Sequence, residues 1–390
     1  MEKIKVGILG ATGMVGQRFI QLLQNHPWFE ISELAASERS AARTYGEAAA
    51  GKWKLESDIP PAAAGMMVKE CKPDLDCRIV FSALDAGVAG PIEEEFARAG
   101  YVVSSNSKNH RMDEDVPLLI PEVNADHTAI IETQKKKNKS GGYIVTNPNC
   151  STIGLVLAVA PLHKKYGVSK IMVTTMQALS GAGYPGVASL DIIDNVVPFI
   201  GGEEGKIESE TLKLLGTLDK GRFAFADIKV SASCNRVQVK DGHLESVSLE
   251  LKKKPSQDEL IQTLKEYNPL RELNLPFAPP RPILVRDEDN RPQPILDAWA
   301  GAPARARAMA VTVGRLRMRG RTLDLFGLVH VAGNPVQHQV TRPAGLVIEA
   351  NGREVELAHF LALYAVQHHP LKLPAEHRQP NPQGVAVDRV

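Results

Sequence analysis

The sequence predicts an α/β protein in which a doubly wound parallel sheet comes first and a second, α+β domain with a largely antiparallel sheet follows. In the first part of the chain, short apolar runs alternate with helical patterns, which is typical of a parallel sheet covered by helices on both faces. A glycine-rich turn follows the first apolar run directly. After residue 150, longer runs of alternating apolar and polar residues predict the second sheet.

Length and composition limit the possible classes of protein. With 390 residues, of which 43% are hydrophobic and 23% charged, the chain has an ordinary globular composition and is too long for one small core. A net charge of +1 argues against binding to nucleic acid. The four cysteines show no C-x-x-C spacing, so we expect reduced thiols and no metal site. No apolar stretch is long enough to span a membrane, so we expect a cytoplasmic protein.

The first domain, 1–149, is expected to alternate strands and helices. A strand over 3–9 precedes the glycine turn, and apolar residues at helical spacing after the turn predict a helix. Further strands are expected over 31–36, 78–83 and 101–104, with a helix over 91–99. Strands in this rhythm pair in parallel, with the helices on both faces of the sheet.

The second domain is expected over 150–319. Its predicted elements are helices over 153–163 and 189–197 and strands over 169–177 and 308–317. Two further strands, over 229–239 and 244–251, are expected to form a pair around the turn Asp241-Gly242. The proline-rich stretch 275–294 is expected to be an ordered loop without regular structure.

The segment 320–390 is expected to be an atypical C-terminal tail. It is rich in histidine, proline and glutamine, and its prolines prevent a long terminal helix. Only 355–366 has a helical pattern.

The glycine-rich turn is a G-x-x-G-x-x-G motif between the first strand and the first helix. Glycine allows the backbone to turn tightly and to approach a pyrophosphate, and the helix N-terminus supplies N–H groups. A tight structural turn is the alternative, but this context favours a Rossmann-type dinucleotide-binding domain. The expected cofactor contacts in this loop are Gly10, Thr12, Gly13, Met14, Val15 and Gly16.

The end of the second strand is expected to select the cofactor. A single acidic residue there favours NAD, because it binds the ribose hydroxyls. The sequence instead offers the hydroxyls of Ser37 and Ser40 and the guanidinium of Arg39, which suit a 2′-phosphate and therefore NADP. Glu38 leaves an alternative open, an ion pair with Arg39 or Arg43.

Cys150 is the strongest candidate nucleophile. It lies in the string Asn-Pro-Asn-Cys-Ser-Thr, directly before a helical pattern, so we expect it at a helix N-terminus where the helix dipole lowers the pKa of a thiol. Asn149 and the neighbouring N–H groups are suited to stabilise an oxyanion. The other three cysteines, Cys71, Cys77 and Cys234, fit small core residues better.

A nucleophile of this kind needs a proton-transfer partner and cations for a charged substrate. His243 and Arg236 lie seven residues apart across the expected strand pair, although a histidine beside Asp-Gly is often only a turn residue. Glu210 and Lys213 lie one helical turn apart, which alone fits an ion pair on a solvated helix face. Arg111 is either a phosphate ligand or an ordinary surface charge.

Residues 1 to about 317 resemble the aspartate-semialdehyde dehydrogenase family, and more closely its archaeal and fungal branch. The resembling strings occur in the order of the family and include GILGATGMVGQRF, ELAASERSAARTYGE, TNPNCSTIG and SASCNRVQVKDGHLESVSLEL. The resemblance implies NADP as cofactor, held by the glycine loop with Ser37, Arg39, Ser40 and Ser82. It also implies that 150–319 is the catalytic and dimerisation domain, that the protein forms homodimers or homotetramers, and that its substrates are small molecules, with no nucleic acid or membrane partner.

The resemblance implies a role for each candidate residue. Cys150 is then the nucleophile, His243 the general acid/base, and Gln177 the residue that orients the acyl-enzyme. Arg236 binds the substrate carboxylate and Glu210 its amino group. The phosphate or acyl phosphate is positioned by Arg111, Asn149 and Lys213.

The implied reaction is the NADP-dependent reduction of L-4-aspartyl phosphate to L-aspartate 4-semialdehyde through a cysteine thioester, in threonine, methionine and lysine biosynthesis. The segment 320–390 departs from the family, because no helix is recognised that would bring an asparagine to the nicotinamide. We therefore expect a weakened cofactor site. Two alternatives stay open: a malonyl-CoA reductase of the same framework, and a non-catalytic NADP-binding relative.

Overall fold

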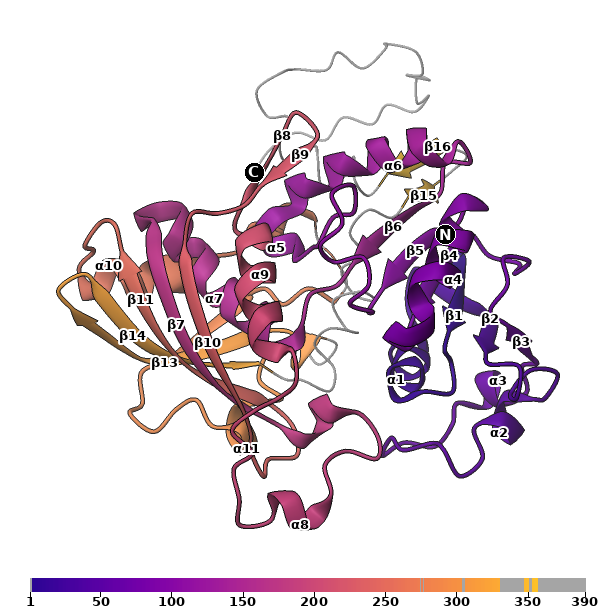
Figure 1. Ribbon diagram of the computed structural model, residues 1–390, viewed down its shortest axis with the longest axis horizontal. Helices are drawn as coiled ribbons and strands as arrows, with labels where there is room; N and C mark the ends of the chain where they lie inside the picture. Colours follow the sequence, from indigo (N-terminus) through magenta and orange to yellow (C-terminus); the bar gives the residue numbers. More distant parts are fainter. Residues whose placement is uncertain are drawn as a thin grey trace, which may run out of the picture.

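The computed structural model describes residues 2–273, 275, 277–303, 306–329, 347–350 and 353–356. Two six-stranded sheets organise these residues. In Figure 1 the N-terminal sheet and its helices lie on the right, and the second sheet lies on the left. Within the described ranges, no helix is long and apolar enough to cross a membrane.

The first sheet is entirely parallel, as predicted, and its strand order is β3-β2-β1-β4-β5-β6. The order reverses between β1 and β4, so a crevice for a dinucleotide forms outside the carboxyl ends of these two strands. The sequence pattern missed the short strands β3 and β6. The strands are β1 (Ile4–Leu9), β2 (Phe29–Ala36), β3 (Val68–Glu70), β4 (Ile79–Ser82), β5 (Val102–Ser105) and β6 (Tyr143–Thr146).

Helices cover this sheet and seal its apolar residues. Phe19 of the first helix packs on Phe81 of β4 with 5.3 Å between the ring centroids. The helix expected from residue 91 begins five residues earlier and keeps Pro91 inside it. The helices of this part are α1 (Met14–Leu23), α2 (Tyr45–Ala48), α3 (Pro61–Ala64), α4 (Ala86–Arg98), α5 (Pro121–Asn124), the 3₁₀ helix η1 (Ala125–Ile130) and α6 (Ile131–Asn138).

The second sheet is mixed, in the order β10-β7-β11-β14-β13-β12. Its three inner pairs are antiparallel and its two outer pairs are parallel, so the largely antiparallel sheet is confirmed. Strand β14 extends this sheet beyond residue 319, because it pairs with both β11 and β13. The strands are β7 (Val168–Gln177), β10 (Lys229–Arg236), β11 (His243–Leu251), β12 (Ile283–Arg286), β13 (Val311–Arg319) and β14 (Thr322–Val329).

Helix α7 (Cys150–Tyr166) crosses one face of the second sheet, and most of its residues are buried. Helices α9 (Glu203–Leu214) and α10 (Gln257–Glu266) pack against α7 from the sides. The short elements are η2 (Leu179–Ala182), α8 (Ser189–Ile192), β8 (Thr217–Asp219), β9 (Arg222–Ala224), η3 (Arg271–Leu273), α11 (Pro294–Asp297), β15 (Val347–Ala350) and β16 (Arg353–Glu356).

The expected pairing of the strands around Asp241-Gly242 is wrong. Strand β7 lies between β10 and β11 and pairs with both along their lengths. Alternating apolar residues satisfy either arrangement, because they require only a buried face and not a particular neighbouring strand.

Three other expectations differ from the structure. The helix expected over 189–197 ends at Ile192, because Ile193 is extended and Asp194 has a positive φ of 55°. The expected loop 275–294 contains the strand β12, which pairs with β13. The helix expected over 355–366 begins inside the strand β16, and its remainder lies outside the described residues.

A buried carboxyl group lies in the middle of the second sheet. Glu245 of β11 stands between Thr175 of β7 and Gly327 of β14, and its side chain is 2% exposed. Its Oε1 atom has no hydrogen-bond partner among the residues that the structure describes. Burial raises the pKa of Glu245 well above its ordinary range, so this group keeps its proton in the folded protein.

We expect Glu245→Gln to stabilise the protein increasingly as the pH rises. Below the ordinary pKa of glutamate both the folded and the unfolded chain hold this proton, and its contribution to stability is fully present. As the pH rises toward the raised pKa of the folded state, only the unfolded chain releases the proton. The contribution of Glu245 to the free energy of unfolding therefore falls by about 1.4 kcal/mol per pH unit. Urea unfolding of both proteins at about pH 5 and about pH 8 should give a difference in unfolding free energy that grows with pH. Equal differences would contradict the prediction.

Candidate active site

The glycine loop has the tight geometry that a dinucleotide site requires. Gly10 has a positive φ of 75°, and a Cβ there would lie 2.6 Å from the carbonyl oxygen of Ala83. A Cβ on Gly16 would lie 2.3 Å from the Gly10 carbonyl oxygen. These two glycines allow α1 to start close beside the ends of β1 and β4. The expected contact residues 12–15 are partly or fully exposed at the start of α1.

Two residues that the sequence pattern did not single out hold this loop. Gln17 donates from Nε2 to the carbonyl oxygens of Thr12 and Lys52, at 2.9 Å each. The Tyr45 hydroxyl donates to the Ala11 carbonyl oxygen at 2.9 Å. The Tyr45 contact spans 34 residues and the Gln17–Lys52 contact spans 35, so no local motif predicts either of them.

The residues expected to select the cofactor lie just after β2. Ser37 and Arg39 are exposed, whereas Ser40 is buried. Arg39 has no hydrogen bond or ion pair to another described residue, and Arg43 donates to the Glu47 carbonyl oxygen. The alternative ion pair of Glu38 with either arginine is therefore not formed in the described part of the chain.

Ser82, also expected at the cofactor, lies at the end of β4. Its hydroxyl is buried and donates to Oε1 of Glu93 at 2.5 Å. In this arrangement the hydroxyl orients a buried carboxyl group.

Cys150 begins α7, as predicted, and faces His243. The side chain of Asn149 caps the helix by accepting from the N–H groups of Ser151 at 3.0 Å and Thr152 at 3.3 Å. Nε2 of His243, the first residue of β11, lies 3.3 Å from the Cys150 sulfur. The fold therefore joins two groups that are 93 residues apart in the chain.

A backbone hydrogen bond fixes which nitrogen of His243 carries the proton. The N–H of Ala178 donates to Nδ1 of His243 at 2.8 Å. A backbone N–H is always a donor, so Nδ1 must accept and neutral His243 carries its proton on Nε2. That nitrogen faces Cys150, so His243 is arranged to donate a hydrogen bond to the sulfur or to an oxygen bound beside it.

The expected lowering of the Cys150 pKa is wrong for the free protein. Burial raises the pKa of this thiol to about 12, and the charge of Glu203 raises it further. The Ser151 N–H and the positive charges of Arg111 and Arg236 act in the opposite direction but do not outweigh burial. A helix N-terminus lowers a thiol pKa only where the thiolate is also solvated or paired, and here Cys150 is partly buried.

Arg236 and Gln177 lie beside His243 because three strands end together. Arg236 ends β10 opposite Gln177, which ends β7, and β11 begins there with His243. Arg236 donates to the Ala178 carbonyl oxygen at 2.7 Å. A Cβ on Gly181 would lie 2.9 Å from His243 Cε1 and 3.1 Å from an Arg236 nitrogen. The side chains of His243 and Arg236 therefore both pack against Gly181.

Arg111 forms a buried ion pair with Glu210, at 2.9 Å. The other carboxylate oxygen of Glu210 accepts from the backbone N–H of Asn149 at 2.6 Å. Burial raises the pKa of Glu210, and the neighbouring Arg111 opposes that effect. The alternative of a solvated helix face is wrong, because Glu210 and Lys213 are both buried.

Lys213 is 1% exposed, and its ammonium group donates to the backbone carbonyl oxygens of Arg111, Asp113 and Val116 at 2.8 to 2.9 Å. Burial lowers its pKa to about 8. In this structure Lys213 therefore holds the segment that carries Arg111, and its donors are occupied by the backbone.

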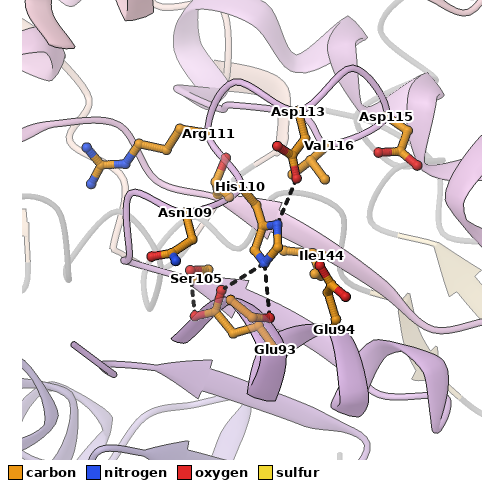
Figure 2. A network of polar contacts seen from close by, with 12 residues as sticks. Glu93, Glu94, Ser105, Asn109, His110, Arg111, Asp113, Asp115, Val116 and Ile144 are labelled. Carbon is orange, nitrogen blue, oxygen red and sulfur yellow. Dashed lines mark hydrogen bonds and ion pairs between the residues drawn. The ribbon is translucent and has the colours of Figure 1, made fainter. Parts of the chain in front are cut away.

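A polar network holds the same segment from its other side. Figure 2 shows His110 between Glu93 and Asp113, while the Arg111 side chain extends away from this network. Nδ1 of His110 lies 2.8 Å from Asp113, and Nε2 lies 3.8 Å from the buried Glu93. With Lys213, this network fixes the backbone position from which Arg111 reaches the site.

Comparisons with known proteins agree with this geometry. A family model described as semialdehyde dehydrogenase, NAD binding domain, matches residues 5–131, and one described as semialdehyde dehydrogenase, dimerisation domain, matches 159–336. The aspartate-semialdehyde dehydrogenase of Archaeoglobus fulgidus is 50% identical over 330 residues, which cover 84% of this chain and 93% of the relative. The aspartate-semialdehyde dehydrogenase of Methanothermobacter thermautotrophicus is 51% identical over 337 residues, which cover 86% of this chain and 95% of the relative.

A solved structure extends the similarity to three dimensions. The crystal structure of aspartate semialdehyde dehydrogenase with NADP from Candida albicans is 41% identical, with a TM-score of 0.78. The match covers 88% of this chain and 99% of that protein. The match to the dimerisation model also continues past residue 319. By identity, coverage and fold, the chain belongs to the aspartate-semialdehyde dehydrogenase family.

Proposed function

We propose that this protein is an NADP-dependent aspartate-semialdehyde dehydrogenase that reduces L-4-aspartyl phosphate to L-aspartate 4-semialdehyde and phosphate through a thioester on Cys150. The observation that carries the proposal is the 3.3 Å contact between the Cys150 sulfur and His243 Nε2, at the start of α7. This reaction would serve the biosynthesis of threonine, methionine and lysine.

Charged groups around Cys150 suit the two anionic ends and the ammonium group of this substrate. Arg236 is assigned to the carboxylate and Arg111 to the phosphate, because a guanidinium binds planar or tetrahedral oxyanions through two donors. Glu210 is assigned to the ammonium group. The presence of Glu210 together with Arg236 and Lys213 supports the aspartyl substrate over malonyl-CoA, which carries no amino group.

The chemistry divides into an acylation and a reduction. The Cys150 thiol loses its proton as the sulfur attacks the acyl carbon, so that a C–S bond forms, the bond to the phosphate oxygen breaks and the departing phosphate takes up the proton. When bound, NADPH supplies the hydride that reduces the thioester. The resulting alkoxide collapses to the aldehyde and the C–S bond breaks, which restores the thiolate. Nε2–H of His243 hydrogen-bonds the developing alkoxide or the departing thiolate.

The first domain is suited to NADP by two features. The exposed loop 12–15 and the N-terminus of α1 lie at the switch point between β1 and β4, where N–H groups bind a pyrophosphate. Arg39 is exposed beyond the end of β2, which supports its assignment to the 2′-phosphate. The segment 320–390, which is expected to depart from the family, lies mostly outside the described residues.

Wild-type protein should reduce NADP when given aspartate semialdehyde and phosphate, and Cys150→Ser should lower kcat by about 10³-fold or more, because a serine hydroxyl is far less ionised than a thiol. Absorbance at 340 nm measures the reaction. Turnover with malonate semialdehyde and coenzyme A instead would identify a malonyl-CoA reductase type. No turnover by a folded wild-type protein would identify a non-catalytic relative.

Arg39→Ala should raise KM for NADP by about 10-fold or more, because a charge-assisted contact is worth about 1.5–3 kcal/mol. KM for NAD, which has no 2′-phosphate, should be nearly unchanged. Arg43→Ala is the matched control, since Arg43 donates to the Glu47 carbonyl oxygen close by. Equal changes for both cofactors would refute the assignment of Arg39.

We propose that the protein is a homo-oligomer built through the open face of the second sheet. Helix α7 covers one face, whereas the other face leaves Met172 and Thr174 of β7 and Ser231 and Ser233 of β10 exposed. The match to a dimerisation domain supports this assignment. Dimers and tetramers are both compatible with an interface on this face.

Met172→Glu should dissociate the oligomer, because it places a charge in the apolar part of this face. Met172 is 50% exposed, and Val88 of α4 on the first domain, at 51%, provides a matched control as Val88→Glu. Light scattering after size-exclusion chromatography measures the mass. A wild-type monomer, or a Met172→Glu protein of unchanged mass, would refute the proposed interface.

A further inference from the structure

Glu203, in the first turn of α9, contacts two amide side chains next to Cys150. Its Oε2 atom accepts from Nδ2 of Asn149 at 2.8 Å and from Nε2 of Gln177 at 3.2 Å. Its Oε1 atom accepts from the ammonium group of Lys206 at 2.6 Å, one turn further along the helix. One carboxylate therefore joins α9 to the start of α7 and to the end of β7.

The carboxylate of Glu203 is ionised. Burial raises its pKa, but the hydrogen bond and charge of Lys206, with the two amides, outweigh burial and leave the pKa below its ordinary value. An ionised carboxylate accepts hydrogen bonds and cannot donate them. Both amides must therefore turn their NH₂ groups toward Glu203, which fixes an orientation that an amide side chain otherwise reverses easily.

For Asn149, this orientation turns Oδ1 toward the helix. Oδ1 accepts from the N–H groups of Ser151 and Thr152 and so fixes the first turn of α7, where Cys150 lies. Glu210, two helical turns after Glu203 and on the same face of α9, accepts from the Asn149 backbone N–H. The residue before the nucleophile is thus held by two carboxylates of one helix.

For Gln177, the orientation leaves the carbonyl oxygen for a ligand. Its NH₂ group donates to Glu203 and, at 2.8 Å, to the Ser151 hydroxyl. Its Oε1 atom is buried and has no hydrogen-bond partner within the described part of the chain. Gln177 can therefore accept a hydrogen bond at the site, whereas its donors are already occupied.

We infer that Glu203 is a positioning residue, which fixes the amide orientations of Asn149 and Gln177 and thereby the geometry around Cys150 in the reaction proposed above. A glutamine at this position is not equivalent. Its amide has one accepting oxygen, so either the two amides or Lys206 would face an NH₂ group. An aspartate keeps the charge but is one methylene too short to hold both contacts.

The inference rests on the proposed function and predicts two separable effects. Glu203→Gln and Glu203→Asp should each lower kcat by about 10²-fold with KM for aspartate semialdehyde nearly unchanged, because a misplaced reacting group costs about that much. Only Glu203→Gln should shift the pH profile of Cys150 alkylation by iodoacetamide to lower pH, because the charge of Glu203 raises the pKa of that thiol. A purely structural role of Glu203 predicts no such difference between the two variants.

Glu204→Gln is the matched control. It removes the same charge from the same turn of α9, but Glu204 accepts from the backbone N–H of Cys234 and does not contact the two amides. Its kcat should stay within about twofold of the wild-type value, a change too small for a lost catalytic contact. Thermal unfolding of every variant tests whether α9 is intact.

Three results would overturn the inference. The first is a Glu203→Gln enzyme with unchanged kcat, and the second is an equal loss in Glu204→Gln. The third is an alkylation profile that moves equally in the Gln and Asp variants. If the wild-type protein shows no turnover, the proposed function fails, and the alkylation profiles still decide whether Glu203 acts on Cys150.

Discussion

The packing of α7 across the second sheet is the interaction on which the rest of the site depends. This helix is apolar around most of its circumference, because the sheet, α9 and α10 enclose it. Its first residue is Cys150, so burial of the helix also sets the depth of the nucleophile. The strands β7, β10 and β11 then bring Gln177, Arg236 and His243 to that same end.

Burial fixes the positions of the side chains in the site, and it also makes an unpaired charge there costly in free energy. Charged groups such as Arg111, Glu210 and Lys213 are held away from water, where an unpaired charge would be strongly unfavourable. Arg111 and Glu210 therefore pair with each other, and Lys213 donates to backbone carbonyl oxygens. The same burial raises the pKa of the Cys150 thiol. Formation of the Cys150 thiolate therefore depends on the hydrogen bond from His243 and on the positive charges of the nearby arginines.

Residues without a recognisable motif do much of the positioning. Tyr45 and Gln17 hold the glycine loop through its backbone, and the Ala178 N–H sets the proton of His243. In the sequence, Glu203 and Lys206 show only an i,i+3 spacing, which is an ordinary feature of a helix surface. Its contacts to Asn149 and Gln177 come from a different helix and strand, so only the folded chain reveals them.

The sequence alone was enough to predict the parallel first sheet, the glycine turn at Gly10 and Gly16, the start of a helix at Cys150, and the family. These follow from backbone geometry and periodicity within a few residues. Three other features are visible only in the folded chain: β7 separates β10 from β11, Glu210 and Lys213 are buried, and the Cys150 pKa is raised. The physical reason is that strand neighbours, burial and electrostatic environment depend on segments far apart in the chain, which local pattern does not specify.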